Sequence, residues 1–189
     1  MLNDHFPSPV YLDYNATTPC EERVLEKMLP WFSRRFGNAA SRQHIFGWEA
    51  AEAVEDARRQ VAALLGADPS EIIFTSGATE SLNLAIKGVL GAYRKKGAHL
   101  ITCATEHQAV LDTCAFVQQQ GAEVSILPVD GQGSPDLSRL EKAIRPDTLA
   151  LVFMTANNET GVIHPVEEIG RLAREKGILF LTDAVQAVG

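Results

Sequence analysis

Short apolar segments and longer amphipathic segments alternate along most of the chain. Five of the apolar segments have the length of a strand and are bounded by turn residues. Such segments predict strands that are buried on both faces, as in a parallel sheet covered by helices. The five predicted strands are Glu71–Thr75, His99–Cys103, Val124–Leu127, Leu149–Thr155 and Ile178–Thr182.

Amphipathic segments lie between the predicted strands, and residues typical of helix ends flank them. Ser41–Leu65 carries apolar residues at helical spacing and is followed by Gly66, a residue type that commonly ends helices. Pro165 marks the start of another helix, because acidic residues follow it and basic residues precede Gly177, as the helix dipole favours. Three further helices are predicted over Ala78–Arg94, His107–Gln120 and Pro135–Ile144, the last with Ser134 as its N-cap.

The regular alternation of these segments predicts an α/β fold with a largely parallel sheet. Residues 1–18 fit neither pattern, so we expect them to form an extended N-terminal arm. Residues 19–189 then form the domain that carries the sheet, and no repeat, low-complexity segment or long linker divides it.

The composition excludes several classes of protein. Of the 189 residues, 46% are hydrophobic and 22% are charged, which is typical of a globular protein. No apolar run approaches the roughly 18 residues that a membrane-spanning helix needs. With 17 Lys and Arg against 24 Asp and Glu, the net charge is −7, and no block of basic residues is present to attract nucleic acid. We therefore expect a soluble protein that binds neither membranes nor nucleic acid.

The cysteines and the N-terminus indicate a cytoplasmic protein. Cys20, Cys103 and Cys114 are odd in number and lack CxxC spacing, so they predict reduced thiols rather than a disulfide framework or a zinc site. The N-terminal residues contain neither the basic region nor the apolar region of a secretory signal.

Ligands of open parallel sheets bind beyond the carboxyl ends of the strands, so polar residues at those ends are the candidate functional residues. The turn Ser76-Gly77-Ala78-Thr79 follows a predicted strand and opens a predicted helix. Backbone N–H groups and the positive end of the helix dipole then point to one place, which suits a phosphate. The alternative is a tight turn in which Ser76 or Thr79 caps the helix.

Three other strand ends carry polar side chains, each with two possible roles. Asp183 follows an apolar strand, where a carboxylate needs a partner such as a protonated ring nitrogen, a helix N-terminus or an arginine. Asn157 and Asn158 could donate hydrogen bonds to a ligand oxygen or form a turn before Gly161. His107 could stack on a planar ligand and exchange protons, or have a structural role in a first helical turn.

One ligand fits all of these strand ends together. Pyridoxal 5′-phosphate (PLP) has a phosphate for the anion site, a pyridine nitrogen for the carboxylate, a phenolic oxygen for an amide donor and an aromatic face for the histidine. Its catalytic property is electron withdrawal, which is strongest when an acidic residue keeps the ring nitrogen protonated. PLP is therefore the cofactor that we expect.

Seven short motifs are spread over essentially the whole chain. The motifs are Tyr11-Leu-Asp-Tyr-Asn-Ala-Thr-Thr-Pro19, Phe36-Gly-Asn38, Phe74-Thr-Ser-Gly-Ala-Thr-Glu-Ser81, Thr105-Glu-His107, Ala109-Val-Leu-Asp-Thr-Cys114, Asn157-Asn-Glu-Thr-Gly161 and Asp183-Ala-Val-Gln186. In order and spacing they closely resemble the amino-terminal half of cysteine desulfurases of the nitrogen-fixation and iron–sulfur-cluster type. These enzymes belong to the class V, fold-type-I family of PLP enzymes.

The resemblance implies the large domain of a fold-type-I PLP-dependent transferase, with a mostly parallel sheet covered by helices, incomplete in this chain. In the family, residues 1–18 belong to the small domain. The strand before Ser76 is separated from the other four by two strands that come later in the family's sequence. We therefore expect residues 1–189 not to build the usual continuous sheet, and to leave strand edges and an apolar face exposed.

The resemblance also implies cofactor-binding roles, residue by residue. Ala78 and Thr79 are similar to the pair that binds the phosphate. Asp183 is similar to the partner of the pyridinium nitrogen, while Asn158 and Gln186 are similar to the contacts of the phenolic oxygen.

His107 is the catalytic residue that the resemblance implies, since its counterpart stacks on the ring and assists proton transfers. The implied reaction converts L-cysteine to L-alanine and leaves the sulfur as a persulfide on an enzyme cysteine. An iron–sulfur scaffold or another acceptor protein then receives the sulfur. Family members are homodimers, so a homodimer is expected here.

The family's Schiff-base lysine lies a short way beyond the Asp183 motif, and this sequence ends at Gly189. No lysine of the chain occupies that place, and Cys20, Cys103 and Cys114 do not correspond to the family's persulfide cysteine. We therefore expect an inactive fragment of a larger enzyme.

Two alternatives remain open from the sequence. One is another class V lyase or aminotransferase that acts on selenocysteine, cysteine sulfinate or an amino donor. The other is a noncatalytic remnant that dimerises or binds a sulfur-transfer partner.

Overall fold

The computed structural model describes residues 9–188, which fall into two compact units with a boundary between Phe74 and Thr75. Residues 9–18 contain a turn but no helix or strand, while the rest of the predicted arm lies outside the described residues. The division into an arm and a domain at residue 18 stays a prediction. Among the described residues, no helix is both long enough and apolar enough to cross a membrane.

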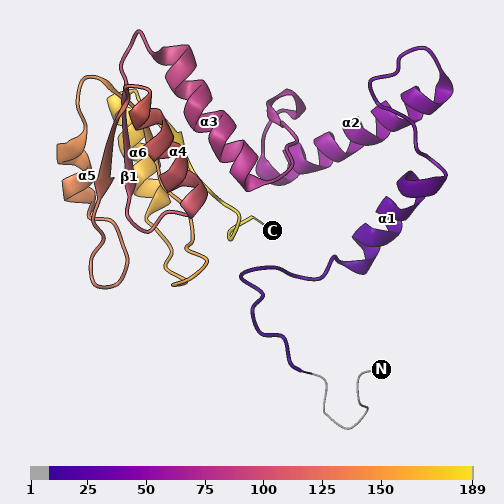
Figure 1. Cartoon of the computed structure of the whole chain (residues 1–189), viewed down its shortest axis with the longest axis horizontal. Helices are drawn as coiled ribbons and strands as arrows, with labels where there is room; N and C mark the ends of the chain where they lie inside the picture. Colours follow the sequence, from indigo (N-terminus) through magenta and orange to yellow (C-terminus); the bar gives the residue numbers. More distant parts are fainter. Residues whose placement is uncertain (1–8, 189) are drawn as a thin grey trace. The chain divides into compact units, whose positions relative to one another are not determined.

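The first unit consists of two α-helices and one short 3-10 helix (Figure 1). α1 (Glu22–Ser33) was not among the predicted helices, and it accommodates Pro30 in its last turn at the cost of one backbone hydrogen bond. α2 spans Ile45–Leu65 and η1 spans Pro69–Glu71.

The helix predicted from Ser41 begins four residues later, at Ile45. His44 caps it, because its Nδ1 accepts the N–H of Gly47 at 3.2 Å. A Cβ on Gly47 would lie 1.9 Å from the carbonyl oxygen of Ser41, so the residues before the helix fold back against its first turn. The predicted C-cap is confirmed, since Gly66 has a φ of 65°, which favours glycine.

The strand predicted over Glu71–Thr75 is wrong for this chain. Glu71 ends η1, and residues 72–75 have no strand partner among the described residues. Their side chains are correspondingly uncovered, with Ile73 70% and Phe74 49% exposed. A strand needs a neighbour to receive its backbone hydrogen bonds, and an apolar sequence cannot supply that neighbour by itself.

The second unit contains the other four predicted strands, joined in one sheet. All pairs are parallel and the order is β2-β1-β3-β4. The α/β fold with a parallel sheet is thereby confirmed, and all four carboxyl ends lie at the same edge. The strands are β1 (His99–Cys103), β2 (Glu123–Leu127), β3 (Thr148–Val152) and β4 (Leu179–Leu181).

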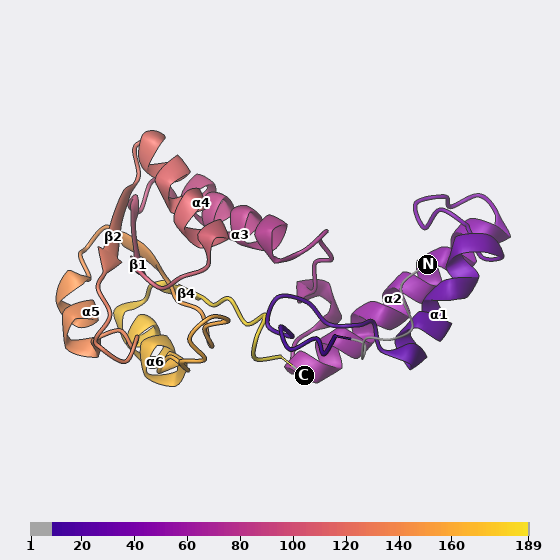
Figure 2. The ribbon, with the colours of Figure 1, turned by 60° about the horizontal axis from the view of Figure 1, so that its bottom comes forward.

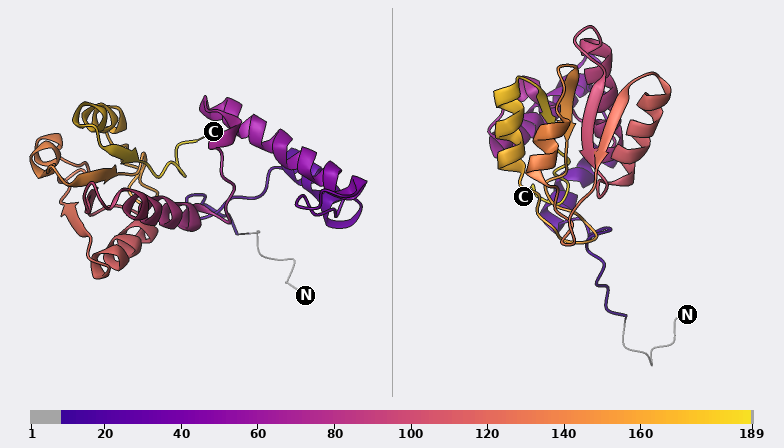
Figure 3. Two further views of the ribbon diagram at one scale, coloured as in Figure 1. Left: turned by 90° about the horizontal axis from the view of Figure 1, so that it is seen from above. Right: turned by 90° about the vertical axis from the view of Figure 1, so that its left-hand side faces the viewer.

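Two layers of helices cover the two faces of this sheet. In Figure 2, α3 and α4 lie on one face and α5 and α6 on the other, and Figure 3 (left) shows the same separation between the pink helices and the orange and yellow ones. Every residue of β1 and β3 is buried, as predicted from their short, mostly apolar segments. The helices are α3 (Ala78–Tyr93), α4 (Gln108–Gln119), α5 (Leu137–Ala143) and α6 (Val166–Lys176).

The predicted N-cap of α5 is wrong by two residues. Ser134 and Pro135 precede the helix, and Pro135 forms an antiparallel bridge with Val129. Asp136 is the cap, because its Oδ1 accepts the N–H groups of Ser138 at 2.8 Å and Arg139 at 3.4 Å.

A buried histidine links three strands near their amino ends. His99 Nδ1 lies 2.8 Å from Thr148 Oγ1, and its Nε2 lies 2.9 Å from Ser125 Oγ. Because the three side chains come from β1, β3 and β2, both ring nitrogens are satisfied inside the sheet.

Candidate active site

The first turn of α3 offers backbone N–H groups without a side-chain cap. Neither Ser76 nor Thr79 caps the helix, which removes that alternative. Ser76 instead donates both its N–H and its hydroxyl to Glu80 Oε2, each at 2.6 Å. A Cβ on Gly77, the N-cap residue, would meet nothing within 4 Å, so the space in front of Ala78 and Thr79 is open. This geometry is that of an anion site at a helix end.

α3 brings this helix end to the ligand-binding edge of the sheet. The helix packs against α4 and β3 and leads into β1, so it runs antiparallel to the strands (Figure 1). Sixteen residues of helix are about 24 Å long, whereas five residues of strand are about 17 Å long. The N-terminus of α3 therefore extends to the carboxyl ends of the strands or beyond them.

Hydrogen bonds connect the segments that follow β1, β3 and β4. Thr155 N–H donates to the carbonyl of Asp183 at 2.8 Å, and the hydroxyls of Thr155 and Thr182 are 2.9 Å apart. Asn157 Nδ2 donates to the carbonyl of Thr105 at 2.7 Å. The three strand ends are thus held together as one polar edge.

His107 is the N-cap of α4 at this edge. Its Nδ1 accepts the N–H of Ala109 at 3.1 Å, so the proton of the neutral ring belongs on Nε2. The side chain is exposed to solvent. The structural role and the ligand-binding role are therefore compatible, because the cap uses one ring nitrogen and leaves the ring face and Nε2 outside the helix.

The two neighbouring asparagines differ in role. Asn157 is buried, and its Oδ1 accepts the N–H groups of Glu159 at 2.9 Å and Thr160 at 2.8 Å, so it forms the turn that was one of its predicted roles. Asn158 is half-buried at the start of that turn. The turn interpretation therefore accounts for Asn157 and leaves Asn158 for a ligand.

Asp183 and Gln186 come from the segment after β4. Asp183 is half-buried and its Oδ1 accepts the N–H of Val185 at 3.0 Å. Gln186 is exposed in the turn that follows. The structure thus brings Asp183, Asn158 and His107 to one edge, on adjacent strands β4, β3 and β1.

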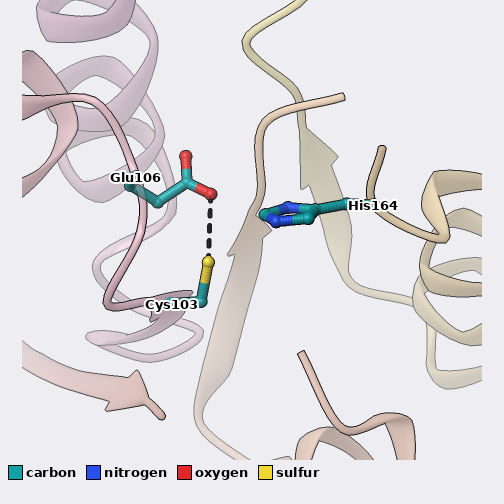
Figure 4. A group of neighbouring side chains, drawn as sticks. All are labelled: Cys103, Glu106 and His164. Carbon is teal, nitrogen blue, oxygen red and sulfur yellow. Dashed lines mark hydrogen bonds between the residues drawn. The ribbon is translucent and has the colours of Figure 1, made fainter. Parts of the chain in front are cut away.

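Cys103, Glu106 and His164 are three buried polar residues next to this edge, and none of them was predicted to have a role there. Glu106 is 5% exposed, and its Oε1 accepts the N–H of Met154 at 2.9 Å and the thiol of Cys103 at 3.3 Å (Figure 4). His164 is 2% exposed and points toward both from the segment before α6. In the sequence, a glutamate three residues after the buried strand β1 was the available signal for Glu106. His164 lies in a loop, and the hydrophobic periodicity of the sequence does not predict where a loop runs.

Burial dominates the ionisation of this group. It raises the pKa of Glu106 to about 7, against the opposing hydrogen bonds from Met154 N–H and the Cys103 thiol, and the Asp183 carboxylate raises it further. Burial also raises the pKa of Cys103 to about 12, with the Glu106 charge adding to the effect. Burial lowers the pKa of His164.

The groups at the polar edge suit the parts of PLP. An uncapped helix end suits a phosphate, a half-buried carboxylate suits a protonated ring nitrogen, and an exposed histidine ring suits an aromatic face. All of these features belong to the second unit of the chain. The fold is that of an open α/β protein, and this edge is the place where proteins of this class bind their ligands.

Comparison with known proteins identifies the family. The family model "Aminotransferase class-V" matches residues 10–189, and the chain belongs to this family, whose members are PLP-dependent enzymes. The chain is 58% identical over 181 residues to a protein of Anaeromyxobacter sp. (strain Fw109-5) named cysteine desulfurase IscS. It is 57% identical over 182 residues to a protein of the same name from Neisseria meningitidis serogroup C. Both alignments cover 96% of this chain and 45% of the relative, so the chain spans less than half the length of these relatives.

Solved structures agree with this assignment. A structure titled "NIFS-LIKE PROTEIN" matches 94% of this chain and 49% of its own, with a TM-score of 0.91 and 43% identity. Another, titled "SspA in complex with cysteine", matches 94% of this chain and 51% of its own, with a TM-score of 0.89 and 44% identity. The resemblance to the amino-terminal half of cysteine desulfurases and the fold-type-I class are therefore confirmed.

Proposed function

We propose that this chain forms part of a PLP-dependent cysteine desulfurase, which converts L-cysteine to L-alanine and passes the sulfur on as an enzyme persulfide. The observation that carries the proposal is the polar edge formed by the segments after β1, β3 and β4. It occurs in a chain 58% identical to a curated cysteine desulfurase. The selenocysteine, cysteine sulfinate and amino-donor alternatives would use the same edge.

Ala78 and Thr79 are proposed to hold the phosphate. Their N–H groups lie in the first turn of α3, where no side chain caps the helix. The helix dipole and these donors favour a dianion, and the Thr79 hydroxyl adds a further donor.

Asp183, Asn158 and Gln186 are proposed to hold the ring. When bound, PLP supplies electron withdrawal to the carbon that carries the substrate amine. Asp183 strengthens that withdrawal, because a half-buried carboxylate favours a proton on the ring nitrogen beside it. Asn158 and Gln186 orient the ring by donating hydrogen bonds to its phenolic oxygen.

His107 is the proposed catalytic residue. The N–H of Ala109 occupies its Nδ1, so Nε2 is the atom that gives up or receives a proton near the substrate. The same hydrogen bond fixes the plane of the ring, which suits stacking on the cofactor.

None of the three cysteines is proposed as the persulfide carrier. The pKa of Cys103 is raised to about 12 and that of Cys114 to about 11, chiefly by burial, so both thiols stay protonated at neutral pH. A protonated, buried thiol is a poor nucleophile. Cys20 is exposed and belongs to the first unit, whereas all the candidate site residues belong to the second.

The wider setting is also part of the proposal. The acceptor of the sulfur is a protein of iron–sulfur cluster assembly or another sulfur carrier, and the enzyme acts as a homodimer in the cytoplasm. The free, buried thiols of Cys103 and Cys114 support a reducing compartment. Two-fold association is the commonest arrangement of soluble enzymes.

Cofactor binding and turnover test the proposal separately. Added PLP should bind with a change in its visible absorption, and Asp183→Asn should weaken binding at least about tenfold, as loss of a charged hydrogen bond does. Asp112→Asn, which alters an exposed carboxylate on α4, should leave PLP affinity unchanged. Equal affinities for the wild type and Asp183→Asn would contradict the proposed ring contact.

Turnover is measured on the protein that carries this chain, with L-cysteine, PLP and a reductant. Alanine and sulfide should appear in equal amounts, and His107→Gln should lower kcat by about a hundredfold or more. Release of alanine from cysteine sulfinate or selenocysteine but not from cysteine would favour the other class V enzymes. No product from any of them would favour a noncatalytic, partner-binding protein.

A further inference from the structure

Cys103, Glu106 and His164 form a group of potential metal ligands. Their sulfur, carboxylate oxygen and imidazole nitrogen atoms lie within 4.8 Å of one another (Figure 4). Each residue is buried, so water does not satisfy them freely. Within the described part of the chain, Glu106 forms no ion pair.

Several polar atoms of this group lack hydrogen bonds. Glu106 Oε2 and both ring nitrogens of His164 are buried without a partner among the described residues. The carbonyl groups of Gly133 and Met154 come near the imidazole but do not reach the geometry of a hydrogen bond. Unsatisfied buried polar atoms are costly, so their presence in neighbouring side chains needs a physical reason.

We propose that Cys103, Glu106 and His164 bind a divalent transition-metal ion of the Zn²⁺ type. A mixed sulfur, nitrogen and oxygen donor set suits such an ion better than Mg²⁺ or Ca²⁺, which prefer oxygen ligands. The fourth coordination position goes to a water molecule. None of the three ligands is among the residues proposed to contact PLP, and binding requires neither the cofactor nor its chemistry.

The charges of the site balance when the metal binds. The Cys103 thiol loses its proton to solvent and becomes a thiolate, and Glu106 binds as a carboxylate. Two negative charges then match the two positive charges of the ion, so the buried complex is neutral. The nearby Asp183 carboxylate adds a negative potential that favours a cation further.

The three ligand atoms need to move only a short distance toward one another to bind a metal ion. Tetrahedral bonds of about 2.0–2.3 Å place neighbouring ligand atoms about 3.3–3.8 Å apart. Cys103 Sγ and Glu106 Oε1 are already 3.3 Å apart, so the remaining separations must shrink by at most about 1.5 Å.

The surroundings also resemble the outer shell of metal sites. The N–H of Met154 holds the carboxylate of Glu106 at 2.9 Å. Metal-bound histidines usually donate their second ring N–H to a carbonyl or carboxylate. The carbonyl groups of Gly133 and Met154 lie near the His164 imidazole and are the acceptors for that hydrogen bond.

Cobalt spectroscopy tests the site directly in the metal-free, PLP-free protein. Exposed Cys20 is first replaced by serine, so that a surface thiol does not bind the probe. Added Co²⁺ should then give a thiolate-to-cobalt charge-transfer band and the visible bands of tetrahedral cobalt, and Zn²⁺ should remove both. Absence of these bands would overturn the proposal and leave the PLP proposal untouched.

Matched variants assign the ligands. Cys103→Ser should abolish the charge-transfer band, and His164→Gln or Glu106→Gln should weaken Zn²⁺ binding by at least about tenfold. Cys114→Ser is the control, since Cys114 is also buried with a raised pKa but lies outside the group. Far-ultraviolet circular dichroism confirms that each variant is folded. A band that survives in Cys103→Ser, or one that is lost in Cys114→Ser alone, would contradict the assignment.

Discussion

At the scale of single residues, His99 couples the stability of the sheet to pH. The pKa of its imidazole is lowered, first by burial and then by the Arg145 charge, against the opposing charges of Asp147 and Glu123. The native protein therefore binds fewer protons at this side chain than the unfolded chain does once the pH falls below about 6.5. Native stability is full above that pH and decreases as the pH is lowered through it.

Replacing His99 with glutamine should flatten this dependence. The wild type should lose up to about 1.4 kcal/mol of unfolding free energy per pH unit from this group just below pH 6.5, and His99→Gln should lack that slope. Denaturant unfolding at several pH values between 5 and 8 measures the difference. Thr148→Ser keeps both the titrating ring and a hydroxyl partner, so it should retain the wild-type slope. Parallel curves for wild type and His99→Gln would refute the prediction.

Sequence reasoning could place some site residues and not others, for a geometric reason. Asp183, Asn158 and His107 follow parallel strands, and parallel strands bring their carboxyl ends to one edge whatever the loops do. His164 meets Glu106 only because the loop before α6 turns back under that edge, and no periodicity describes such a loop.

At the scale of elements, the start of α5 shows how two capping signals compete. A serine followed by proline predicted the cap at Ser134, since proline favours the first helical position. Pro135 instead pairs with Val129, and Asp136 takes the capping role. The prediction of a helix here was correct, because the apolar face of a helix depends on the spacing of several apolar residues rather than on one capping residue.

Replacing Ser134 or Asp136 with alanine tests which of the two residues caps α5. Asp136→Ala removes the acceptor of the Ser138 and Arg139 N–H groups and should lower the thermal midpoint by a few degrees. Ser134→Ala should leave the midpoint nearly unchanged, since the cap bonds do not involve its side chain. Thermal unfolding followed by circular dichroism measures both. A larger loss for Ser134→Ala would reverse the assignment.

At the scale of the whole molecule, the apolar core lies in one of the two units. Both buried hydrophobic clusters consist of residues after Thr75, and they occupy the two faces of the sheet. In the first unit, α1 buries no residue, and α2 buries only Gly47, Ala50 and Ala62. The four confirmed strands belong to the unit with the core, and the strand that was predicted wrongly belongs largely to the other.

Residues 75–189 are therefore expected to fold alone. A truncated protein that consists of residues 75–189 should unfold cooperatively, because it retains both buried hydrophobic clusters. Its thermal midpoint should lie within about 5 °C of that of the full chain. Circular dichroism and amide hydrogen exchange of β1 and β3 measure this. Non-cooperative unfolding, or loss of protection in β1, would show that the core depends on residues before Thr75.

The order β2-β1-β3-β4 has a consequence for synthesis on the ribosome. β1 gains its first neighbour when Leu127 is made, but its other side stays open until β3 is completed at Val152, 25 residues later. At the usual rates of translation this interval is roughly one to five seconds. During that time the nascent chain presents a strand that is fully buried in the finished fold and still has an unpaired edge, which is the kind of segment that chaperones bind.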